Sequence, residues 1–390
     1  MSPAGTRILQ VRSSAGLYGA DRVVLALNRG LNRPTAADGL VRSRLLSINN
    51  YRMQRQPVHE AALMADQPAV LLPCRGRLDH ATVRALACEI RNEKADILHA
   101  HDYKSAFYAW LASRIEPVKL VATLHGQVGT SRSLRIYNRL ELALLRRFDA
   151  LAVVAADQIA TLRAAGIPDA LIHLIDNGIE LPAAGTRSAV AAAALRSAVH
   201  AEAGLDVGVF VFAAVGRLAP EKNLAMLLEA FVPISAGGGV ALLLIGEGPE
   251  RAALEARIAQ LGLGRHVHLL GERTDMARIY AAMDCLVLPS LSEGMPLVVL
   301  EAMAHGVPVL ASRVGEVPRL LSHAGHARLL PPGDAGALQA GLDGMRLGSR
   351  VYDVKARDYV VAHHSLAAMT ARYLELYQSL EGRVDVRQSA

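Results

Sequence analysis

Short apolar runs alternate with longer amphipathic segments along this 390-residue chain. The runs are rich in Val, Ile, Leu and Ala, as in parallel strands that are buried on both faces. Stretches of helix length separate them, which indicates βαβ units. The strands expected in the first half are Arg7–Val11, Arg44–Ile48, Ala95–Leu98, Lys119–Leu124, Ala150–Ala155 and Ile172–Ile175, and the helices include Asp21–Leu31 and Asp79–Asn92.

A second series of the same kind follows an alanine-rich segment, 181–205, that contains no strand-like run. The pattern predicts an α/β protein with two tandem doubly wound domains, 1–183 and 184–360, and a final segment 361–390 that holds an amphipathic helix. Two domains also agree with the length, because single cores stop growing at about 250–300 residues. The strands expected in the second series are Val209–Val215, Val240–Ile245, Val267–Leu269, Cys285–Leu288, Pro308–Ala311 and Ala327–Leu330, and its helices are Asn223–Phe231, Pro249–Leu261, Thr274–Met283 and Pro296–His305.

The composition excludes several classes of protein. Hydrophobic residues make up 52% and charged residues 20%, which excludes a disordered chain. Aromatic residues make up 4%, with one Trp, which argues against a surface that stacks nucleic-acid bases. The three Cys fit neither a disulfide framework nor a zinc motif, no signal peptide is evident, and no apolar run reaches the ~18–20 residues of a membrane span. We therefore expect a cytoplasmic protein with no nucleic-acid partner.

Positive charge is concentrated in the first half of the chain. Residues 1–180 carry 23 Lys and Arg against 16 Asp and Glu, whereas residues 181–390 carry 19 against 20. This asymmetry indicates an anionic partner of the first domain, or it reflects compositional drift alone. Within the first half, residues 131–148 place five Arg among Leu and Ile at helical spacing. This segment either lies peripherally on an anionic membrane or packs its Leu face on the domain and leaves its arginines in solvent.

Two loops carry glycines or cations directly after an expected strand, where ligands of α/β sheets bind. Gly16 and Gly19 follow the first strand in a turn that either meets an anion with its backbone N–H groups or is a tight turn without a ligand. Arg217 and Lys222 follow Val209–Val215 and suit an anionic ligand, with a solvated basic loop as the alternative.

Two carboxylates, Glu293 and Glu301, lie eight residues apart after the strand Cys285–Leu288. Glu293 falls in a loop, and Glu301 falls about one and a half turns into the next helix. Glu301 has apolar neighbours in the sequence and needs a partner, which is either a pair of ligand hydroxyls or an internal Arg. The helix begins near Pro296, and its free N–H groups suit an anion such as a diphosphate. These N–H groups belong to Gly294, Met295, Leu297 and Val298.

The motifs resemble those of the retaining glycosyltransferases of family 4. The first half matches through SSAGLYGADR, DILHAHDY, VATLHGQ and DNGIEL. The second half matches through VGRLAPEKN, LLIGEGPER, HVHLLGERTDM, DCLVLPSLSEGMPLVVLEAMAHGVPVLAS and ARLLPPGD. The resemblance implies the GT-B fold, in which two Rossmann-like domains face a cleft and a C-terminal helix crosses back to the first domain.

The resemblance also implies roles for individual residues. Arg217 and Lys222 would hold the donor diphosphate, Glu301 the ribose hydroxyls, and Glu293 the transferred sugar near its reacting carbon. The diphosphate cradle would be Gly294, Met295, Pro296 and Leu297, and the loop of Gly271, Glu272 and Arg273 would meet the nucleobase. In the first domain, Gly16 and Gly19 would approach the donor phosphate and acceptor, and His125 would lie beside the transferred sugar. A departure at Val314–Arg319, where Arg319 stands in place of the family's glutamate, puts a donor contact by that loop in doubt.

The activity implied by the resemblance is hexosyl transfer (EC 2.4 class) with retention and without a metal or other cofactor. The donor would be a nucleoside-diphosphate sugar, linked to UDP or GDP, and the acceptor a glycan or lipid-linked glycan of surface polysaccharide or glycolipid synthesis. No Asp-x-Asp metal motif lies where the donor phosphate would bind, so cations would neutralise the leaving group. A sugar-nucleotide epimerase on the same fold and a non-catalytic nucleotide-sugar-binding protein are the alternatives.

Overall fold

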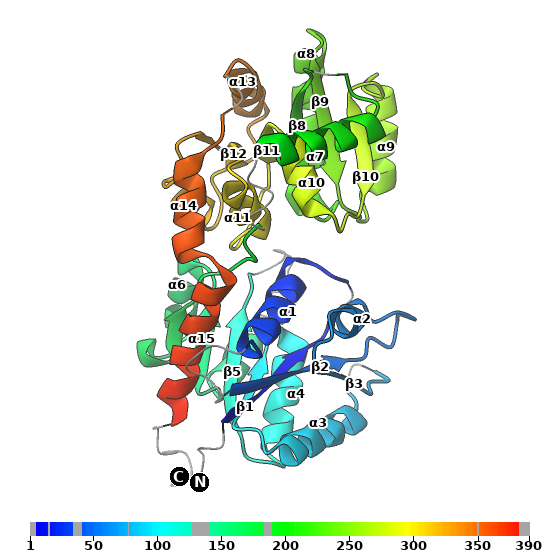
Figure 1. The fold of residues 1–390 in the computed structure, drawn as a ribbon. Coiled ribbons are helices and arrows are strands. Elements are labelled where there is room, and N and C mark those ends of the chain that lie inside the picture. Colours follow the sequence, from blue (N-terminus) through cyan, green and yellow to red (C-terminus); the bar gives the residue numbers. More distant parts are fainter. Residues whose placement is uncertain are drawn as a thin grey trace. The chain divides into compact units, whose positions relative to one another are not determined.

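The computed structural model describes residues 5–14, 16–33, 41–76, 78–126, 140–182, 189–206, 208–348 and 351–381. The chain divides into two compact units. The first comprises Met1–Gly178 together with Leu366–Ala390, and the second comprises Ile179–Ser365. Figure 1 shows each unit as a sheet with helices packed on it. The predicted basic helix at 131–148 lies outside the described residues up to residue 139.

The described strands of the first unit form one parallel sheet in the order β3-β2-β1-β4-β5-β6-β7. The order reverses between β1 and β4, as in Rossmann-type sheets, and such a reversal is the usual place of a ligand. The strands are β1 (Thr6–Arg12), β2 (Val41–Ile48), β3 (Ala69–Leu72), β4 (Ile97–Ala100), β5 (Lys119–Leu124), β6 (Ala150–Val153) and β7 (Ile172–Leu174). The helices are α1 (Gly19–Leu31), α2 (Pro57–Met64), α3 (His80–Glu93), α4 (Tyr103–Ser113), α6 (Ala156–Ala164) and α15 (Leu366–Glu381).

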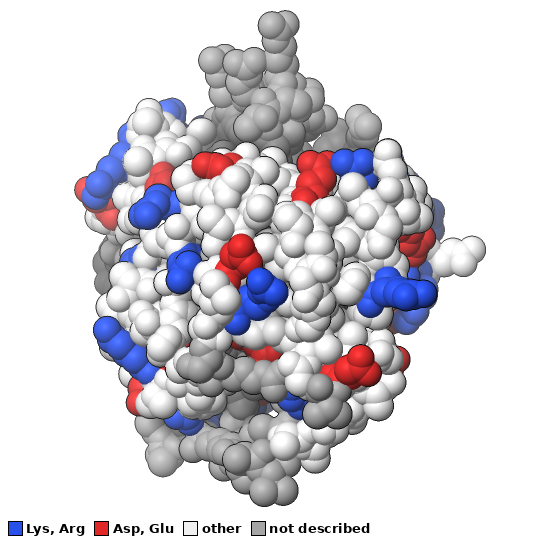
Figure 2. Space-filling view, turned by 90° about the horizontal axis from the view of Figure 1, so that it is seen from above, with Lys and Arg blue, Asp and Glu red and all other residues white. Residues whose placement is uncertain are grey.

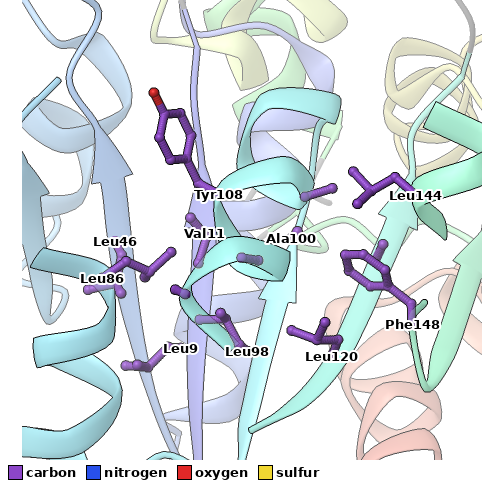
Figure 3. Packing of buried hydrophobic residues seen from close by; sticks show 14 of the residues in the cluster. Leu9, Val11, Leu46, Leu86, Leu98, Ala100, Tyr108, Leu120, Leu144 and Phe148 are labelled. Atoms are coloured by element: carbon purple, nitrogen blue, oxygen red, sulfur yellow. The ribbon is translucent and has the colours of Figure 1, made fainter. Parts of the chain in front are cut away.

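The core of the first unit lies between the sheet and the helices α3 and α4 (Figure 3). Apolar side chains of neighbouring strands meet there, because every second residue of a strand points to the same face. Leu98 of β4 and Phe148 are fully buried. The cluster also includes Leu9, Val11, Leu46, Leu86, Ala100, Tyr108, Leu120 and Leu144.

The second unit repeats the same topology. Its described strands are all parallel, in the order β10-β9-β8-β11-β12-β13, and the order reverses between β8 and β11. The strands are β8 (Phe210–Val215), β9 (Val240–Ile245), β10 (Val267–Gly271), β11 (Cys285–Leu288), β12 (Val309–Ser312) and β13 (Ala327–Leu330). The helices are α7 (Ala189–Glu202), α8 (Leu224–Ser235), α9 (Arg251–Gln260), α10 (Met276–Ala282), α11 (Leu297–Ala304), α12 (Val317–Leu321), α13 (Ala335–Arg346) and α14 (Val354–His363). On the face shown in Figure 2, basic and acidic side chains are interspersed among uncharged ones.

The last helix, α15, belongs to the first unit although it follows the second unit in sequence. The backbone N–H of Gly178 donates to the sulfur of Met369 at 3.1 Å, and Arg372 donates to Asp176 at 3.4 Å. The chain therefore passes between the units at 178–179 and at 365–366, compared with 183–184 and 360–361 expected from the sequence. Among the described residues, no helix is both long and apolar enough to cross a membrane.

Candidate active site

The loop after β8 carries two of the predicted binding residues, Arg217 and Lys222, and the loop after β9 braces it. The Leu218 N–H donates to the Glu247 carbonyl at 3.0 Å. A Cβ on Gly246 would lie 2.0 Å from the Gly216 carbonyl oxygen, and one on Gly248 would lie 2.3 Å from that of Leu218. Both positions therefore require glycine. This structural role was not identified from the sequence, although two glycines separated by one residue after a strand indicate close backbone contact.

Lys222 and Glu293 form the centre of the site. The Lys222 Nζ lies 2.6 Å from Glu293 Oε1, and the Ser290 hydroxyl donates to the same oxygen at 2.7 Å. The side chains of the ion pair are only 19% and 10% exposed, so the charges are largely removed from water. The pair joins the ends of β8 and β11, where the strand order reverses.

Arg217 and Lys222 line one small hollow together with Gly216, Pro289 and Ser290. The Arg217 guanidinium lies 2.5 Å from a carboxylate oxygen of Glu221 on the same loop. Both predicted cations are thus brought to one place, and each has a carboxylate partner that an incoming anion would have to replace.

Helix α11 begins at Leu297, four residues after Glu293, and carries Glu301. The Tyr280 hydroxyl donates to Glu301 Oε2 at 2.6 Å. The Tyr280 ring stacks on His305, with centroids 4.8 Å apart, and the Glu301 carbonyl lies 2.8 Å from His305 Nδ1. Glu301 therefore has a phenol as one partner, which the sequence did not suggest. The first N–H groups of α11 lie beyond the reach of its own carbonyls, as at any helix start.

The loop after β12 packs directly on the Glu293 turn. Gly315 has φ +50°, and a Cβ there would lie 2.3 Å from the Glu293 carbonyl oxygen. The Glu316 N–H donates to the Gly294 carbonyl at 2.9 Å, and Arg319 pairs with the Glu316 carboxylate. Arg319, the departure noted in the sequence, thus stabilises a loop that supports the turn.

Arg273, predicted to lie near the nucleobase, is held by two carboxylates. Its guanidinium pairs with Asp275 at 2.8 Å and with Glu202 of α7. The hydrogen bonds that Arg273 donates to the Asp275 and Glu202 carboxylates raise its pKa above the ordinary value. The adjoining Gly271 contacts the loop after β9, because its carbonyl accepts from the Gly246 N–H at 2.8 Å.

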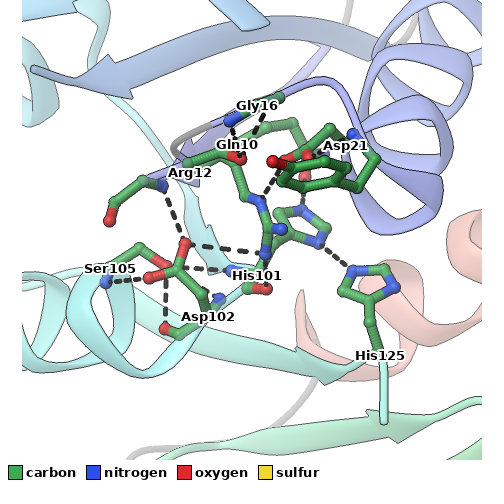
Figure 4. Close-up of polar contacts among 11 residues, drawn as sticks. Gln10, Arg12, Gly16, Asp21, His101, Asp102, Ser105 and His125 are labelled. Atoms are coloured by element: carbon green, nitrogen blue, oxygen red, sulfur yellow. Dashed lines mark hydrogen bonds and ion pairs between the residues drawn. The ribbon is translucent and has the colours of Figure 1, made fainter. Parts of the chain in front are cut away.

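In the first unit, a buried ion pair holds the loop after β1 (Figure 4). Arg12 Nε lies 2.7 Å from the fully buried Asp21 of α1, and Asp21 also accepts from the Tyr18 N–H at 2.8 Å. A Cβ on Gly16 would lie 2.4 Å from the Tyr18 ring, whereas Gly19 faces open space at the start of α1. A side chain at Gly16 would therefore have to displace the exposed Tyr18 ring, and Gly19 is the more accessible of the two predicted glycines.

His125, predicted to lie beside the transferred sugar, ends a chain of hydrogen bonds (Figure 4). Its Nε2 lies 3.2 Å from His101 Nδ1, and His101 Nε2 lies 2.6 Å from Gln10 Oε1. The Gln10 amide donates to the Tyr377 hydroxyl of α15 at 3.3 Å. With Gln10 oriented in this way, His101 carries its proton on Nε2 and His125 donates from its own Nε2. His125 Nδ1 is then a buried lone pair, and no described group pairs with it.

Burial lowers the pKa of the three histidines that take part in this group of hydrogen bonds, His99, His101 and His125. The pKa of His99 falls to about 3, and those of His101 and His125 fall well below their ordinary value, with smaller contributions from other charges nearby. All three imidazoles are therefore neutral at pH 7. His99 bonds Tyr377 at 2.7 Å and Thr123 at 2.8 Å. No group of three or more potential metal ligands occurs among the described residues.

The topology of both sheets defines two Rossmann-like domains in tandem, the arrangement of a GT-B protein. Anabaena HepE, solved with UDP and glucose, has the same fold, with a TM-score of 0.82 and 20% identity over 96% of this chain and 100% of that one. The family model described as "Glycosyl transferases group 1" matches residues 209–345, and "Glycosyltransferase Family 4" matches residues 51–182. The chain therefore belongs to glycosyltransferase family 4, whose members are transferases of the EC 2.4 class.

Two curated relatives are similar over much of the chain. N-acetyl-α-D-glucosaminyl L-malate synthase of Bacillus anthracis is 28% identical over 66% of each chain. UDP-Gal:α-D-GlcNAc-diphosphoundecaprenol α-1,3-galactosyltransferase of Escherichia coli is 30% identical over 58% of this chain and 59% of its own length. The matched region thus spans about three fifths to two thirds of these relatives.

Proposed function

We propose that this chain transfers a hexose, with retention and without a metal, from a nucleoside-diphosphate sugar to an acceptor in surface polysaccharide or glycolipid synthesis. The Lys222–Glu293 pair carries this proposal, because it places a cation and a carboxylate together beside the start of α11. The nucleotide would be UDP or GDP. The E. coli relative is named for a UDP-galactose donor, and HepE was solved with UDP and glucose.

The chemistry follows from what these groups can stabilise. Cleavage of the sugar–phosphate bond leaves negative charge on the diphosphate, and Arg217, Lys222 and the first N–H groups of α11 are donors that can bind it. Glu293 would give up its bond to Lys222 and accept hydrogen bonds from the transferred sugar. Attack by the acceptor hydroxyl on the face from which the diphosphate departs retains the configuration. The hydroxyl proton passes to the departing phosphate oxygen.

The first test is a thermal-shift screen over UDP, GDP and ADP sugars, followed by a transfer assay with the donor that raises the melting temperature. A ligand that binds only the native state raises that temperature. We expect Glu293→Gln to abolish transfer with little loss of donor binding. A Glu293→Gln variant that transfers at the wild-type rate would contradict the assignment. Incubation with the donor alone tests the epimerase alternative, which requires an epimer to form without any acceptor.

Chelation tests the metal-free part of the proposal. Because side-chain cations and backbone N–H groups can neutralise the diphosphate, we expect transfer to continue at an unchanged rate in EDTA. Loss of activity in EDTA that added Mg²⁺ restores would show that a metal takes part.

A further inference from the structure

A pocket of about 620 Å³ opens at the carboxyl edge of the first sheet, and its size suits a small organic ligand. Segments that follow β1, β2 and β3 form its walls together with the first turns of α4. Its lining includes Tyr51 and Arg52 after β2, Leu78 after β3, and Tyr103, Lys104 and Phe107 of α4.

Two cations of this pocket have no carboxylate partner among the residues that the structure describes, although Lys104 also interacts with the thiol of Cys74. Lys104 Nζ lies 5.9 Å from the centroids of the Tyr51 and Tyr108 rings, and Arg52 lies 5.6 Å from the Tyr51 ring. The neighbouring Arg55, by contrast, is paired with Glu60 at 2.7 Å. The pocket thus holds two positive charges that cation–π contacts orient but do not neutralise.

The same pocket exposes large apolar surface. Leu78 is 74% exposed and Tyr51 is 39% exposed, and Tyr103 and Phe107 are half-buried at the wall. Aromatic faces next to polar groups pack well against flat ligands with an apolar face, of which the C–H face of a sugar ring is one. A ligand that matches this pocket has a ring and an anionic group side by side.

We propose that this pocket binds a phosphorylated sugar, with its phosphate between Lys104 and Arg52 and its ring on Tyr51 and Phe107. A phosphate offers oxygens to two cations at once and suits the guanidinium fork. The inference rests on the proposed function and deepens it, because it assigns the acceptor to the class of sugar phosphates. The phosphate belongs either to a free sugar phosphate or to the lipid-linked end of a glycan.

Isothermal titration of the full chain with glucose 1-phosphate tests the site. We expect Lys104→Gln and Arg52→Gln each to weaken binding at least tenfold, since each removes a charged hydrogen bond. Arg114→Gln removes an exposed charge at the far end of α4 and is the matched control, which we expect to bind normally. Glucose without phosphate should bind far more weakly. Circular dichroism verifies that each variant is folded.

Two further arms separate the proposals from one another. Lys222→Gln should weaken UDP binding and leave glucose 1-phosphate binding unchanged. Lys104→Gln should weaken glucose 1-phosphate binding and leave UDP binding unchanged. Glucose 1-phosphate that binds Lys104→Gln and wild type equally, or that binds neither while UDP binds normally, overturns the phosphate pocket alone. Failure of UDP to bind wild type counts instead against the proposed function.

The source of the phosphate is tested with phosphatidylcholine vesicles that carry glucosyl polyprenyl phosphate. Sedimentation of wild type with these vesicles, and its loss in Lys104→Gln, assigns the pocket to a lipid-linked acceptor. Binding of glucose 1-phosphate without sedimentation assigns it to a free sugar phosphate. The proposal is overturned if wild type and Lys104→Gln sediment equally with these vesicles and glucose 1-phosphate does not bind.

Discussion

Lys222 and Glu293 share a short ion pair that is largely withdrawn from solvent. In the proposed enzyme, Lys222 exchanges this partner for the donor diphosphate. Lys222→Gln keeps a hydrogen-bond donor but removes the charge. A hydrogen bond to a charged group contributes about 1.5–3 kcal/mol. We therefore expect affinity for the free nucleoside diphosphate to fall about 10- to 100-fold, measured by titration calorimetry.

The control for this change is Lys355→Gln, which removes an exposed charge from α14. We expect Lys355→Gln to bind the diphosphate with wild-type affinity. Unchanged binding in Lys222→Gln would show that Lys222 is only a partner of Glu293 and does not contact the diphosphate.

The buried histidines of the first unit predict a dependence of stability on pH. Burial lowers the pKa of His99 to about 3 and those of His101 and His125 well below 6.5, whereas the unfolded chain titrates near 6.5. Below pH 6.5 the unfolded state therefore binds more protons, and stability falls as the pH falls. Each histidine contributes at most about 1.4 kcal/mol per pH unit. Urea unfolding followed by fluorescence of the single Trp, Trp110, measures this slope between pH 6.5 and 5.

Two variants separate the contribution of His99 to this pH dependence from that of the other histidines. His99→Gln retains groups that can bond Tyr377 and Thr123, and it should reduce the slope by about 0.7 kcal/mol per pH unit at pH 6.5, rising to about 1.4 near pH 5. His80→Gln changes an exposed histidine and should leave the slope unaltered. Equal slopes in wild type and His99→Gln would contradict a neutral, buried His99.

At this scale, the sequence showed which residue types gather at the site but not their partners. Arg217, Lys222 and Glu293 follow strands, so their position at one sheet edge could be predicted. The Glu293–Lys222 pair depends on β8 and β11 being neighbours in the sheet, and the Tyr280–Glu301 bond joins α10 to α11; no local spacing encodes either contact. That His125 lies beside the transferred sugar stays a prediction; its bond to His101 and the burial of its Nδ1 could not be read from the sequence.

Among the structural elements, the loop after β12 has a supporting role that can be tested at Gly315. Its Cβ would meet the carbonyl oxygens of Glu293 and Gly294 at 2.3 and 2.4 Å. Gly315→Ala should therefore displace the Glu293 turn and reduce transfer more than tenfold. It should also cost about 1–3 kcal/mol of stability beyond the conformational strain itself. Transfer kinetics and urea unfolding measure the two effects.

Gly262→Ala is the matched control, because Gly262 has φ +68° but open space around it. It carries the same kind of backbone strain without the collision. We expect a small loss of stability and no loss of transfer. Equal behaviour of the two variants would show that the contact between Gly315 and the turn has no functional weight.

Most strands could be predicted because each is an apolar run long enough to cross a sheet, and β9 and β11 lie as expected. The four-residue strand β3 at the edge of the first sheet was missed. The order of the strands could not be predicted from these runs, because it depends on the edge of the sheet at which each successive strand is added. Helix α8 was expected to end at Phe231, but it continues through Pro233 to Ser235. Proline disfavours a helix interior, yet Phe231 and Ile234 are buried on the same face, and this packing outweighs the lost hydrogen bond.

For the whole molecule, the division into two units implies that the diphosphate stabilises one of them. Arg217, Lys222 and the start of α11, which are proposed to bind its charge, lie within Ile179–Ser365, whereas Trp110 lies in the first unit. Saturating UDP, at about 100 times its dissociation constant, adds about 2.7 kcal/mol to the unit that binds it. For a unit of this size, the shift is roughly 5–10 °C.

Calorimetry combined with Trp110 fluorescence measures this difference. We expect two calorimetric transitions, and UDP should raise only the one that Trp110 fluorescence does not follow. Lys222→Gln should remove the shift at the same UDP concentration. A shift confined to the Trp110 transition would place the diphosphate in the first unit. A single calorimetric transition that Trp110 fluorescence also follows would show that the units unfold together, which contradicts their independence. Since each unit has its own parallel sheet and its own buried core, we expect separate transitions.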